Sequence, residues 1–200
     1  VKAADLSDWM PGGLRAGLWG AYTQKSHWQV YNADLSRPFR ETNYEPELIL
    51  AVHPDWPLGA ARVRLLSVSL THQSNGRANP LSRSWNRVIA TAGVEQGPLA
   101  LTLRGWARMR DGSDDNPDIT RYLGHGDVSL DWRAGTQRFG LTGRLNPGSG
   151  KGAVQARWSF PLARRVRGEV QAFSGYGETM IDYNWKQTTV GLGVSLDDRR

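Results

Sequence analysis

The sequence of 200 residues contains no cysteine. This absence excludes disulfide bonds, thiolate nucleophiles and metal sites built on cysteine. The chain also lacks any apolar run of about 18 residues, so it has no candidate for a transmembrane helix. Neither absence excludes a membrane protein, because the strands of a transmembrane barrel are segments of about ten residues in which apolar and polar side chains alternate.

Aromatic residues, glycine and positive charge are plentiful. Nine tryptophans and six tyrosines suit the aromatic girdles of a membrane protein, although aromatic cores also use them. The net charge is +6, and the arginines alternate with apolar residues instead of forming a basic stripe. We therefore interpret the positive charge as belonging to a solvated or lumenal face, and we expect no nucleic-acid partner.

A long alternating segment runs from residue 14 to residue 30. Leu14, Leu18 and Tyr22 belong to one row, whereas Arg15 and Lys25 belong to the other, which we expect to face a lumen. Gln24 is the polar exception on the apolar row. Its amide lies either near lipid headgroups or at an intramembrane interface where it finds a hydrogen-bond partner.

The same alternation recurs along the chain and predicts about ten strands. Arginines share the inner rows, which favours an all-β antiparallel transmembrane β-barrel with an apolar exterior, although a soluble barrel or sandwich has the same periodicity. We expect residues 32–43 to form a loop. The predicted strands cover residues 14–30, 44–52, 62–74, 84–92, 99–110, 128–132, 139–145, 154–160, 166–172 and 190–196.

One predicted hairpin carries residues of hydrolytic chemistry. Counting along the strand, His72 and Ser74 fall on the apolar row of Val68 and Leu70, and Asn86 falls on the apolar row of the returning strand. A serine hydroxyl needs a base within hydrogen-bond reach to become a nucleophile, and the base needs a third group to fix its tautomer. The row assignment therefore predicts an ester-cleaving site on the outer face, whereas a strand end followed by an Asn-Gly turn is the purely structural interpretation.

The turn after the second candidate residue also offers hydrogen-bond donors. A tetrahedral intermediate needs donors for its oxyanion, and the backbone N–H groups of Ser74 and Gly76 are the candidates. Gly76 lets the backbone approach closely because it has no side chain.

A second polar segment covers residues 111–118, where four carboxylates occur within eight residues. Carboxylate oxygens are ligands for hard cations such as calcium, but the pattern of an EF-hand is incomplete. The segment alone is therefore more typical of a solvated turn than of a metal site.

Six short blocks together resemble the outer-membrane phospholipase A family. They occur in the same order and spacing between about residue 22 and residue 196. The blocks are YTQKS at 22–26, SRPFRETNYEP at 36–46, HQSNGR at 72–77, SRSWNR at 82–87, DDNPDIT at 114–120 and SGYGE at 174–178.

The resemblance implies a twelve-stranded barrel in the bacterial outer membrane that hydrolyses acyl esters of phospholipids, requires calcium and acts as a homodimer. In this family pattern His72 is the base, Ser74 the nucleophile and Asn86 the third member of the triad. Gln24 matches a glutamine of the dimer interface. The implied calcium ligands are Ser82, the Arg77 carbonyl, the Ser36 carbonyl from the partner subunit, and Asp115, whose neighbour Asp114 is the alternative.

Three features depart from the family pattern. About ten strands are visible, so residues 1–200 are expected to form a single barrel domain that lacks the family's first two strands. The last residues carry no terminal aromatic side chain, and Asn79 stands where an acidic residue is expected. Two other classes of function stay open, namely a non-catalytic, porin-like or structural barrel and a soluble lipid-binding barrel.

Overall fold

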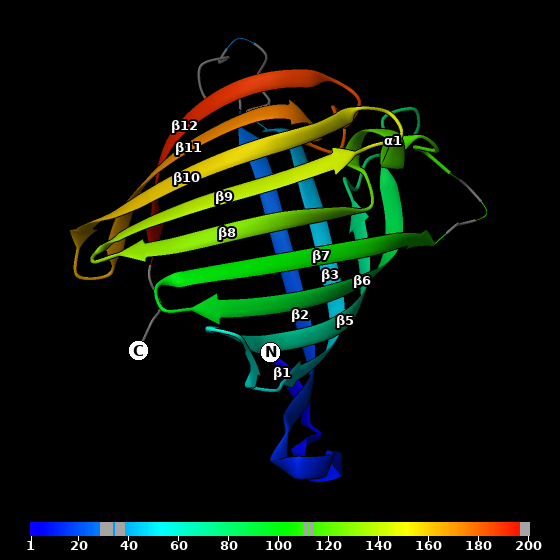
Figure 1. Cartoon of the computed structure of the whole chain (residues 1–200). Coiled ribbons are helices and arrows are strands. Elements are labelled where there is room, and N and C mark those ends of the chain that lie inside the picture. The colour runs from blue at the N-terminus through cyan, green and yellow to red at the C-terminus, as the bar shows by residue number, and fades with distance from the viewer. Residues whose placement is uncertain (29–33, 35–38, 110–111, 113, 197–200) are drawn as a thin grey trace.

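A computed structural model describes residues 1–28, 34, 39–109, 112 and 114–196. These residues form one antiparallel sheet, a short α-helix and two 3-10 helices (Figure 1). The helical elements are η1 (Ser7–Trp9), η2 (Pro11–Gly13) and α1 (Ile119–Leu123). The strands are β1 (Lys2–Asp5), β2 (Arg15–Trp28), β3 (Phe39–His53), β4 (Trp56–Leu58), β5 (Ala61–Ser74), β6 (Ser84–Gln96), β7 (Leu99–Met109), β8 (Gly126–Ala134), β9 (Gln137–Asn146), β10 (Lys151–Ala163), β11 (Val166–Tyr176) and β12 (Lys186–Leu196).

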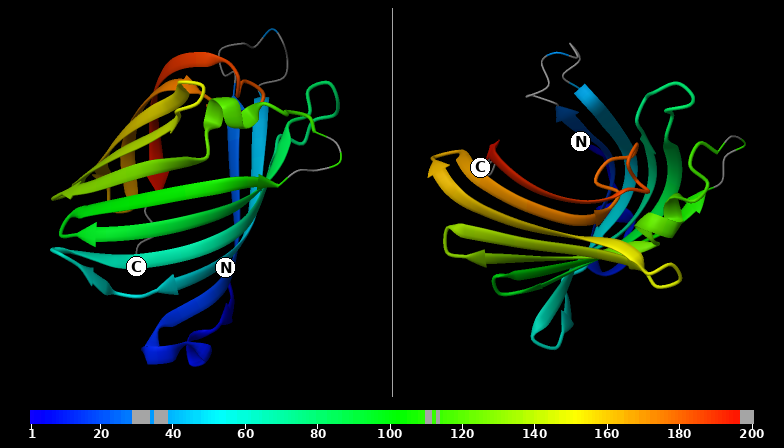
Figure 2. Two further views of the ribbon diagram at one scale, coloured as in Figure 1. Left: turned by 45° about the vertical axis from the view of Figure 1, so that its right-hand side comes forward. Right: turned by 90° about the horizontal axis from the view of Figure 1, so that it is seen from above.

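Neighbours in the sheet follow the order of the chain. The path runs from β1 through β2, β3 and β5 to β12, and the short β4 pairs with β5. Each predicted strand corresponds to one of the longer strands, so the all-β antiparallel prediction is confirmed. Figure 2 shows that the sheet curls around an interior, and in the described residues its path stays open between β1 and β12.

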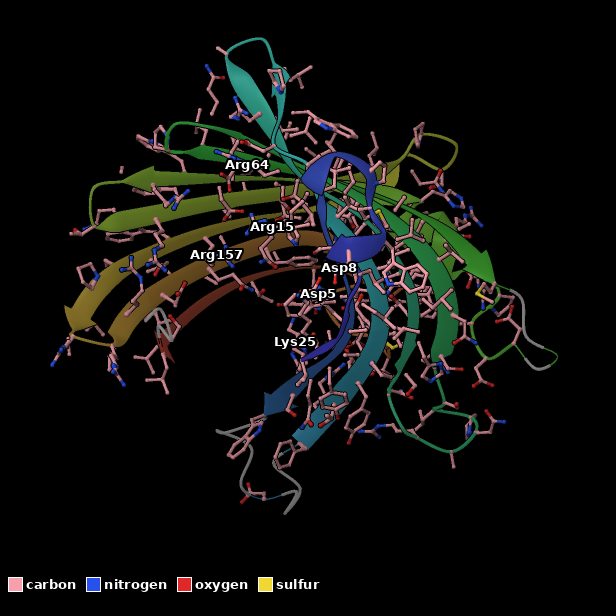
Figure 3. The ribbon with its side chains drawn as sticks, turned by 90° about the horizontal axis from the view of Figure 1, so that it is seen from below. Asp5, Asp8, Arg15, Lys25, Arg64 and Arg157 are labelled. Atoms are coloured by element: carbon pink, nitrogen blue, oxygen red, sulfur yellow. The ribbon has the colours of Figure 1, made fainter. Side chains whose placement is uncertain are left out.

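The two faces of the curled sheet differ as the alternation predicts. Large apolar side chains are exposed on the outer face, and polar and charged side chains occupy the inner face. The outer row of β8, for example, has Val128, Leu130 and Trp132 between 41% and 48% exposed. On the inner face, Arg87 is only 7% exposed. Arg87 and Lys25 both line a cavity inside the curled sheet, and Figure 3 shows Lys25 there.

Strand β3 begins earlier than predicted. Residues 39–43 belong to it and not to a loop, because they extend the pairing with β2, as in the match of Ser26 with Thr42. The hydroxyl groups of that pair also lie 3.1 Å apart. The alternation of apolar and polar residues did not predict this strand start, because the buried residues here, Glu41 and Asn43, are polar and pack against a distant segment.

That distant segment is the connection between β11 and β12. Glu41 accepts hydrogen bonds from the backbone N–H of Ile181, at 2.9 and 3.0 Å, and from the Asn43 amide at 2.8 Å. The connection therefore folds into the curve of the sheet (Figure 2). Its buried side chains complete an apolar core at one end of the interior, formed by Trp85, Ile89, Trp106, Ile119, Leu123, Met180 and Tyr183.

Helix α1 was not expected, because its five residues are too few to produce a helical period. It supplies Ile119 and Leu123 to the core. No helix in the described parts of the chain has the length and apolar character needed to cross a membrane.

Candidate active site on the outer wall

Strands β5 and β6 bring two of the predicted catalytic residues together. His72 and Asn86 are direct partners in the antiparallel register, so their side chains leave the same face of the sheet. His72 Nδ1 lies 2.7 Å from Asn86 Oδ1. Because a carbonyl oxygen only accepts hydrogen bonds, Nδ1 carries the hydrogen and Nε2 is the basic nitrogen.

The pair lies on the outer face. Val68 and Leu70, which precede His72 in its row, are 50% and 52% exposed. Asn86 is flanked by Trp85 and Arg87, which are almost completely buried on the inner face. The alternation of strand side chains therefore places the imidazole and the amide among apolar neighbours on the exterior.

Ser74 is the last residue of β5 and lies two positions after His72. It pairs with Tyr44 of β3 on one side and with Ser84 of β6 on the other, and it is half-buried. Residues two apart on a strand share a face, so the hydroxyl and the imidazole project to the same side, about 7 Å apart at the Cβ atoms. This places the candidate nucleophile next to the candidate base.

A compact loop follows Ser74 and is organised by one buried asparagine. Asn75 Nδ2 donates to the Leu81 carbonyl at 2.8 Å, and its Oδ1 accepts from the backbone N–H groups of Arg77 and Arg83. Gly76 adopts a φ of +62°, and a Cβ there would lie 3.0 Å from the Tyr44 ring. The loop thus holds the strand end in one conformation next to the candidate oxyanion donors, Ser74 and Gly76, whose role stays a prediction.

Two of the predicted calcium ligands meet in the structure. The Ser82 hydroxyl donates to Asp115 Oδ2 at 2.5 Å, although the two residues belong to different loops. Asp114 instead binds the Arg108 guanidinium and the Asn116 N–H. This arrangement favours Asp115 over its neighbour as a candidate ligand, because the carboxylate of Asp114 already has a cationic partner.

The remaining predicted ligands are less well defined. The Arg77 side chain donates to the Arg40 carbonyl, and Ser36 lies outside the described residues. Within the described ranges, no group of three or more histidine, cysteine, aspartate or glutamate side chains could hold a metal ion. A hydroxyl and a carboxylate in contact nevertheless fit calcium, which prefers oxygen ligands and also accepts backbone carbonyls and water.

Gln24 lies on the outer face of β2 and is exposed. Its Oε1 accepts from the Tyr22 hydroxyl at 3.2 Å, and its Nε2 donates to Ser26 Oγ at 3.4 Å. Ser26 in turn meets Thr42 of β3. Gln24, the polar exception on the apolar row, is therefore part of a short series of hydrogen-bonded polar side chains on an otherwise apolar wall.

Sequence reasoning missed two asparagines that shape the site. Asn75 appeared only as half of an Asn-Gly turn, but its side chain closes the loop. Asn116 is fully buried and accepts a hydrogen bond from the backbone N–H of Ser84 at 2.9 Å, which ties the acidic loop to the start of β6. Asparagine in a loop before a strand is a turn signal, and only the fold reveals which distant backbone group it binds.

The acidic loop is also tied to the apolar core. The Tyr183 hydroxyl donates to Asp118 Oδ1. Burial and this bonded carboxylate raise the pKa of Tyr183 above its ordinary value. The loop that carries Asp115 is thus fixed both to the hairpin of His72 and to the segment that fills the interior.

A large, mostly apolar hollow of about 1090 Å³ lies elsewhere on the outer wall. Val68, Ala90 and Leu103 are among its lining residues, whereas His72, Ser74 and Asn86 are not. The candidate catalytic residues lie instead at the end of β5 and the start of β6.

Comparison with known proteins settles the family. The family model described as phospholipase A1 matches residues 5–196. The chain belongs to the phospholipase A1 family. A putative phospholipase A1 of Neisseria meningitidis is 47% identical over 191 residues, which cover 92% of this chain and 50% of the relative.

Other members show the same relation. The phospholipase A1 of Escherichia coli K12 is 40% identical over 186 residues, which cover 93% of this chain and 64% of the relative. The chain therefore spans between half and two thirds of the length of these phospholipase A1 relatives. The resemblance inferred from the six sequence blocks is confirmed.

Solved structures of the phospholipase A1 family share the fold. Outer membrane phospholipase A from Escherichia coli matches with a TM-score of 0.88 at 40% identity, covering 92% of this chain and 71% of that chain. An outer membrane phospholipase dimer from Salmonella typhi with bound calcium matches equally well. The predicted barrel architecture is thereby confirmed, whereas the expectation that residues 1–200 lack the family's first two strands stays a prediction.

Proposed function

We propose that this chain is a calcium-dependent phospholipase A of the bacterial outer membrane, active as a homodimer. The observation that carries the proposal is the hydrogen bond between His72 Nδ1 and Asn86 Oδ1 on the outer wall, two strand positions before Ser74, which pairs with Ser84. This contact leaves Nε2 as the nitrogen that accepts the serine proton. Membership of the phospholipase A1 family supports the same chemistry.

The reaction proceeds in two acyl-transfer steps. Ser74 Oγ attacks the carbonyl carbon of an acyl ester while His72 Nε2 takes the hydroxyl proton. The tetrahedral intermediate collapses, the C–O bond of the ester breaks, and His72 returns the proton to the departing alcohol. Water, deprotonated by His72, then attacks the acyl-serine. The bond between the acyl carbon and Ser74 Oγ breaks, His72 returns the proton to Ser74 Oγ, and a fatty acid leaves.

Asn86 holds the imidazole in the tautomer that this cycle requires. An amide stabilises the imidazolium less than a carboxylate would, but it does not place a charge on a wall of apolar side chains. N–H donors at Ser74 and Gly76 would bind the oxyanion. Ser82, Asp115 and the Arg77 carbonyl would hold calcium, with Ser36 of a second copy, and the ion would supply positive charge that stabilises the oxyanion.

The outer wall indicates where the substrate comes from. Its side chains are predominantly apolar and exposed, which suits contact with lipid acyl chains. A phospholipid in the surrounding bilayer would reach His72 and Ser74 sideways, without entering the interior. The hydrogen-bonded side chains of Tyr22, Gln24 and Ser26 would bind the same three side chains of a second copy. Amides and hydroxyls on an apolar wall are stabilised by such hydrogen bonds across an interface.

A non-catalytic, porin-like barrel is less consistent with the interior. In the described part of the chain, seven buried apolar side chains pack across one end of the interior. A cavity of about 230 Å³ is lined both by these apolar side chains, such as Trp85 and Met180, and by charged ones such as Lys25 and Arg144. A water-filled pore needs an open lumen, so packing favours the enzyme.

The decisive experiment compares Ser74→Ala with the unaltered chain after refolding in detergent micelles. We expect calcium-dependent release of fatty acid from phospholipid by the unaltered chain, and its loss in the variant or in excess chelator. The variant should keep the migration of a folded barrel on unheated gels. Activity that survives in Ser74→Ala would refute the proposed function.

A further inference from the structure

His72 and Asn86 leave the same face of the sheet as direct partners in the register of β5 and β6. Both project from the outer wall, where the neighbours in their rows, Leu70 and Val88, are apolar. Catalytic side chains must be held close to their productive geometry, and contacts of the residues around them normally do this. The opposite face of the same two strands offers such contacts next to this pair.

The residues next to the catalytic positions form a hydrogen-bonded cluster on that inner face. Gln73 lies between His72 and Ser74, and Trp85 and Arg87 flank Asn86. Gln73 Oε1 accepts from Trp85 Nε1 at 2.7 Å and from the Arg87 guanidinium at 3.3 Å. We call Gln73, Trp85 and Arg87 the inner clamp, because its bonds join β5 to β6 directly behind the pair.

The inner clamp is fixed to two further strands. Arg87 lies over the Trp85 ring at 4.2 Å and 5.7 Å from the ring of Trp106 on β7. It also forms an ion pair with Glu45 of β3 at 3.4 Å. Trp85 is 1% exposed and packs edge-on against Trp106. A buried arginine needs all these partners, since an unpaired buried charge is costly, so the cluster has little freedom to rearrange.

Strand geometry couples the inner clamp to the catalytic pair. Gln73 pairs with Trp85 in the register, and His72 pairs with Asn86 one position away. A shift between β5 and β6 would break the inner bonds and separate the imidazole from the amide at the same time. Because neighbouring residues share one peptide unit, the backbone transmits small displacements as well.

We propose that Gln73 is a positioning residue that, through Trp85 and Arg87, holds His72 opposite Asn86 and next to Ser74. It acts from inside the barrel and touches neither lipid nor substrate. The inference rests on the proposed function and adds to it a device that sets the geometry of the site. It explains why a polar amide lies between two catalytic residues, on the face away from the chemistry.

The test compares three substitutions in refolded chain. Gln73→Leu removes the acceptor, whereas Gln73→Glu keeps an oxygen that accepts from both donors. Gln137→Leu is the matched control, because Gln137 Oε1 also accepts from a tryptophan, Trp158 Nε1, at 2.7 Å, on β9 and β10 away from the site. The measurements are kcat and KM for phospholipid in mixed micelles with saturating calcium.

We expect Gln73→Leu to lower kcat by about tenfold to a hundredfold with a nearly unchanged KM, as for a small misplacement of a catalytic group. Gln73→Glu and Gln137→Leu should retain most of the activity. Unchanged kcat in Gln73→Leu would overturn the proposal, and so would equal losses in Gln73→Leu and Gln137→Leu. If Gln73→Leu does not fold, Trp85→Phe removes one donor and keeps a ring, and its kcat takes the place of the missing value.

A readout independent of activity separates this inference from the proposed function. The Nδ1–H of His72 donates to Asn86, so its proton resonance is identified by NMR as the one lost in His72→Ala. We expect that resonance to move or exchange faster in Gln73→Leu but not in Gln137→Leu. A chain without hydrolytic activity would refute the phospholipase assignment alone, whereas an unmoved resonance in Gln73→Leu would refute the positioning role.

Discussion

At the scale of single residues, the site combines groups that tolerate an apolar surrounding. His72 Nδ1 bonds to the side chain of Asn86, an amide that carries no charge. A carboxylate at this position would face the exterior among exposed leucines and valines, where burial in hydrocarbon is costly for an ion. The choice of an amide is therefore consistent with a triad on the outside of a barrel.

One residue with a displaced pKa gives a prediction in alkaline solution. Burial and the bonded Asp118 carboxylate raise the pKa of Tyr183, so its phenol keeps its proton above the ordinary tyrosine pKa of about 10. Above that pH the unfolded chain releases a proton that the folded chain retains, so this contribution to stability is complete below about pH 10 and declines as the pH rises further.

Absorbance of tyrosinate during an alkaline titration measures the effect. Tyr183→Phe should remove a tyrosine step that lies above the ordinary tyrosine range, and Asp118→Asn should move that step to lower pH. Loss of an early step in Tyr183→Phe would contradict the assignment.

At the scale of elements, the β5–β6 hairpin carries the candidate base, nucleophile and third member of the triad and one candidate metal ligand. Its outer rows carry His72 and Asn86, its inner rows carry the inner clamp, and its connection carries Gly76 and Ser82. Asn75 closes that connection, and Asn116 ties the start of β6 to the acidic loop. One hairpin therefore sets the positions of the candidate nucleophile, base and metal ligand together.

Alanine substitutions at two glycines would distinguish the cost of backbone strain from the cost of side-chain crowding. Gly76 and Gly97 both have positive φ, +62° and +54°, but only Gly76 has a neighbour, the Tyr44 ring, within 4 Å of an added Cβ. Gly97→Ala should lower the free energy of unfolding by about 1 kcal/mol from strain alone, with full hydrolytic activity. Gly76→Ala should cost more and also lower kcat, because Tyr44 pairs with Ser74.

Urea unfolding in detergent and kcat on micellar phospholipid are the measurements. Equal activity in the Gly76→Ala and Gly97→Ala variants would show that the shape of the loop does not matter for catalysis.

At the scale of the whole molecule, the curled sheet reverses the usual arrangement of a soluble protein. Its exterior is apolar, and its interior holds ion pairs such as Arg104–Asp127 together with a small apolar core. The connection between β11 and β12 reaches across the interior to β3, where Asp182 binds Arg40 and Ile181 binds Glu41. These contacts join the connection between β11 and β12 to β3, on the opposite part of the described sheet.

A charge placed on the exterior tests whether lipid surrounds the sheet. Leu130 lies at the middle of β8 on the outer face and is 41% exposed. Leu130→Arg should destabilise the protein by about 2–4 kcal/mol when it folds into lipid vesicles, because arginine at the bilayer midplane is costly. Leu162→Arg, near the end of β10, should cost about 1 kcal/mol or less.

Denaturant titrations in vesicles measure both values. A soluble barrel would tolerate the two exposed substitutions equally, so equal and small effects would exclude the membrane assignment and favour the alternative of a soluble lipid-binding protein.

The sequence by itself determined the strands, their faces and the family. Alternation with a period of two is a local property, so counting along the chain was enough to place His72 and Asn86 on the outer row and Arg87 on the inner one. The motif blocks added the identities of the candidate catalytic residues, because their types and spacing are written directly in the chain.

Only the tertiary structure decided which residues meet. The contacts of Ser82 with Asp115, of Glu41 with Ile181 and of Gln73 with Trp85 join positions between 12 and 140 residues apart. Each depends on strand register and on how the sheet curls, which side-chain periodicity does not specify. Polar residues at strand ends and in loops therefore acquired their partners, and with them their proposed roles, from the fold.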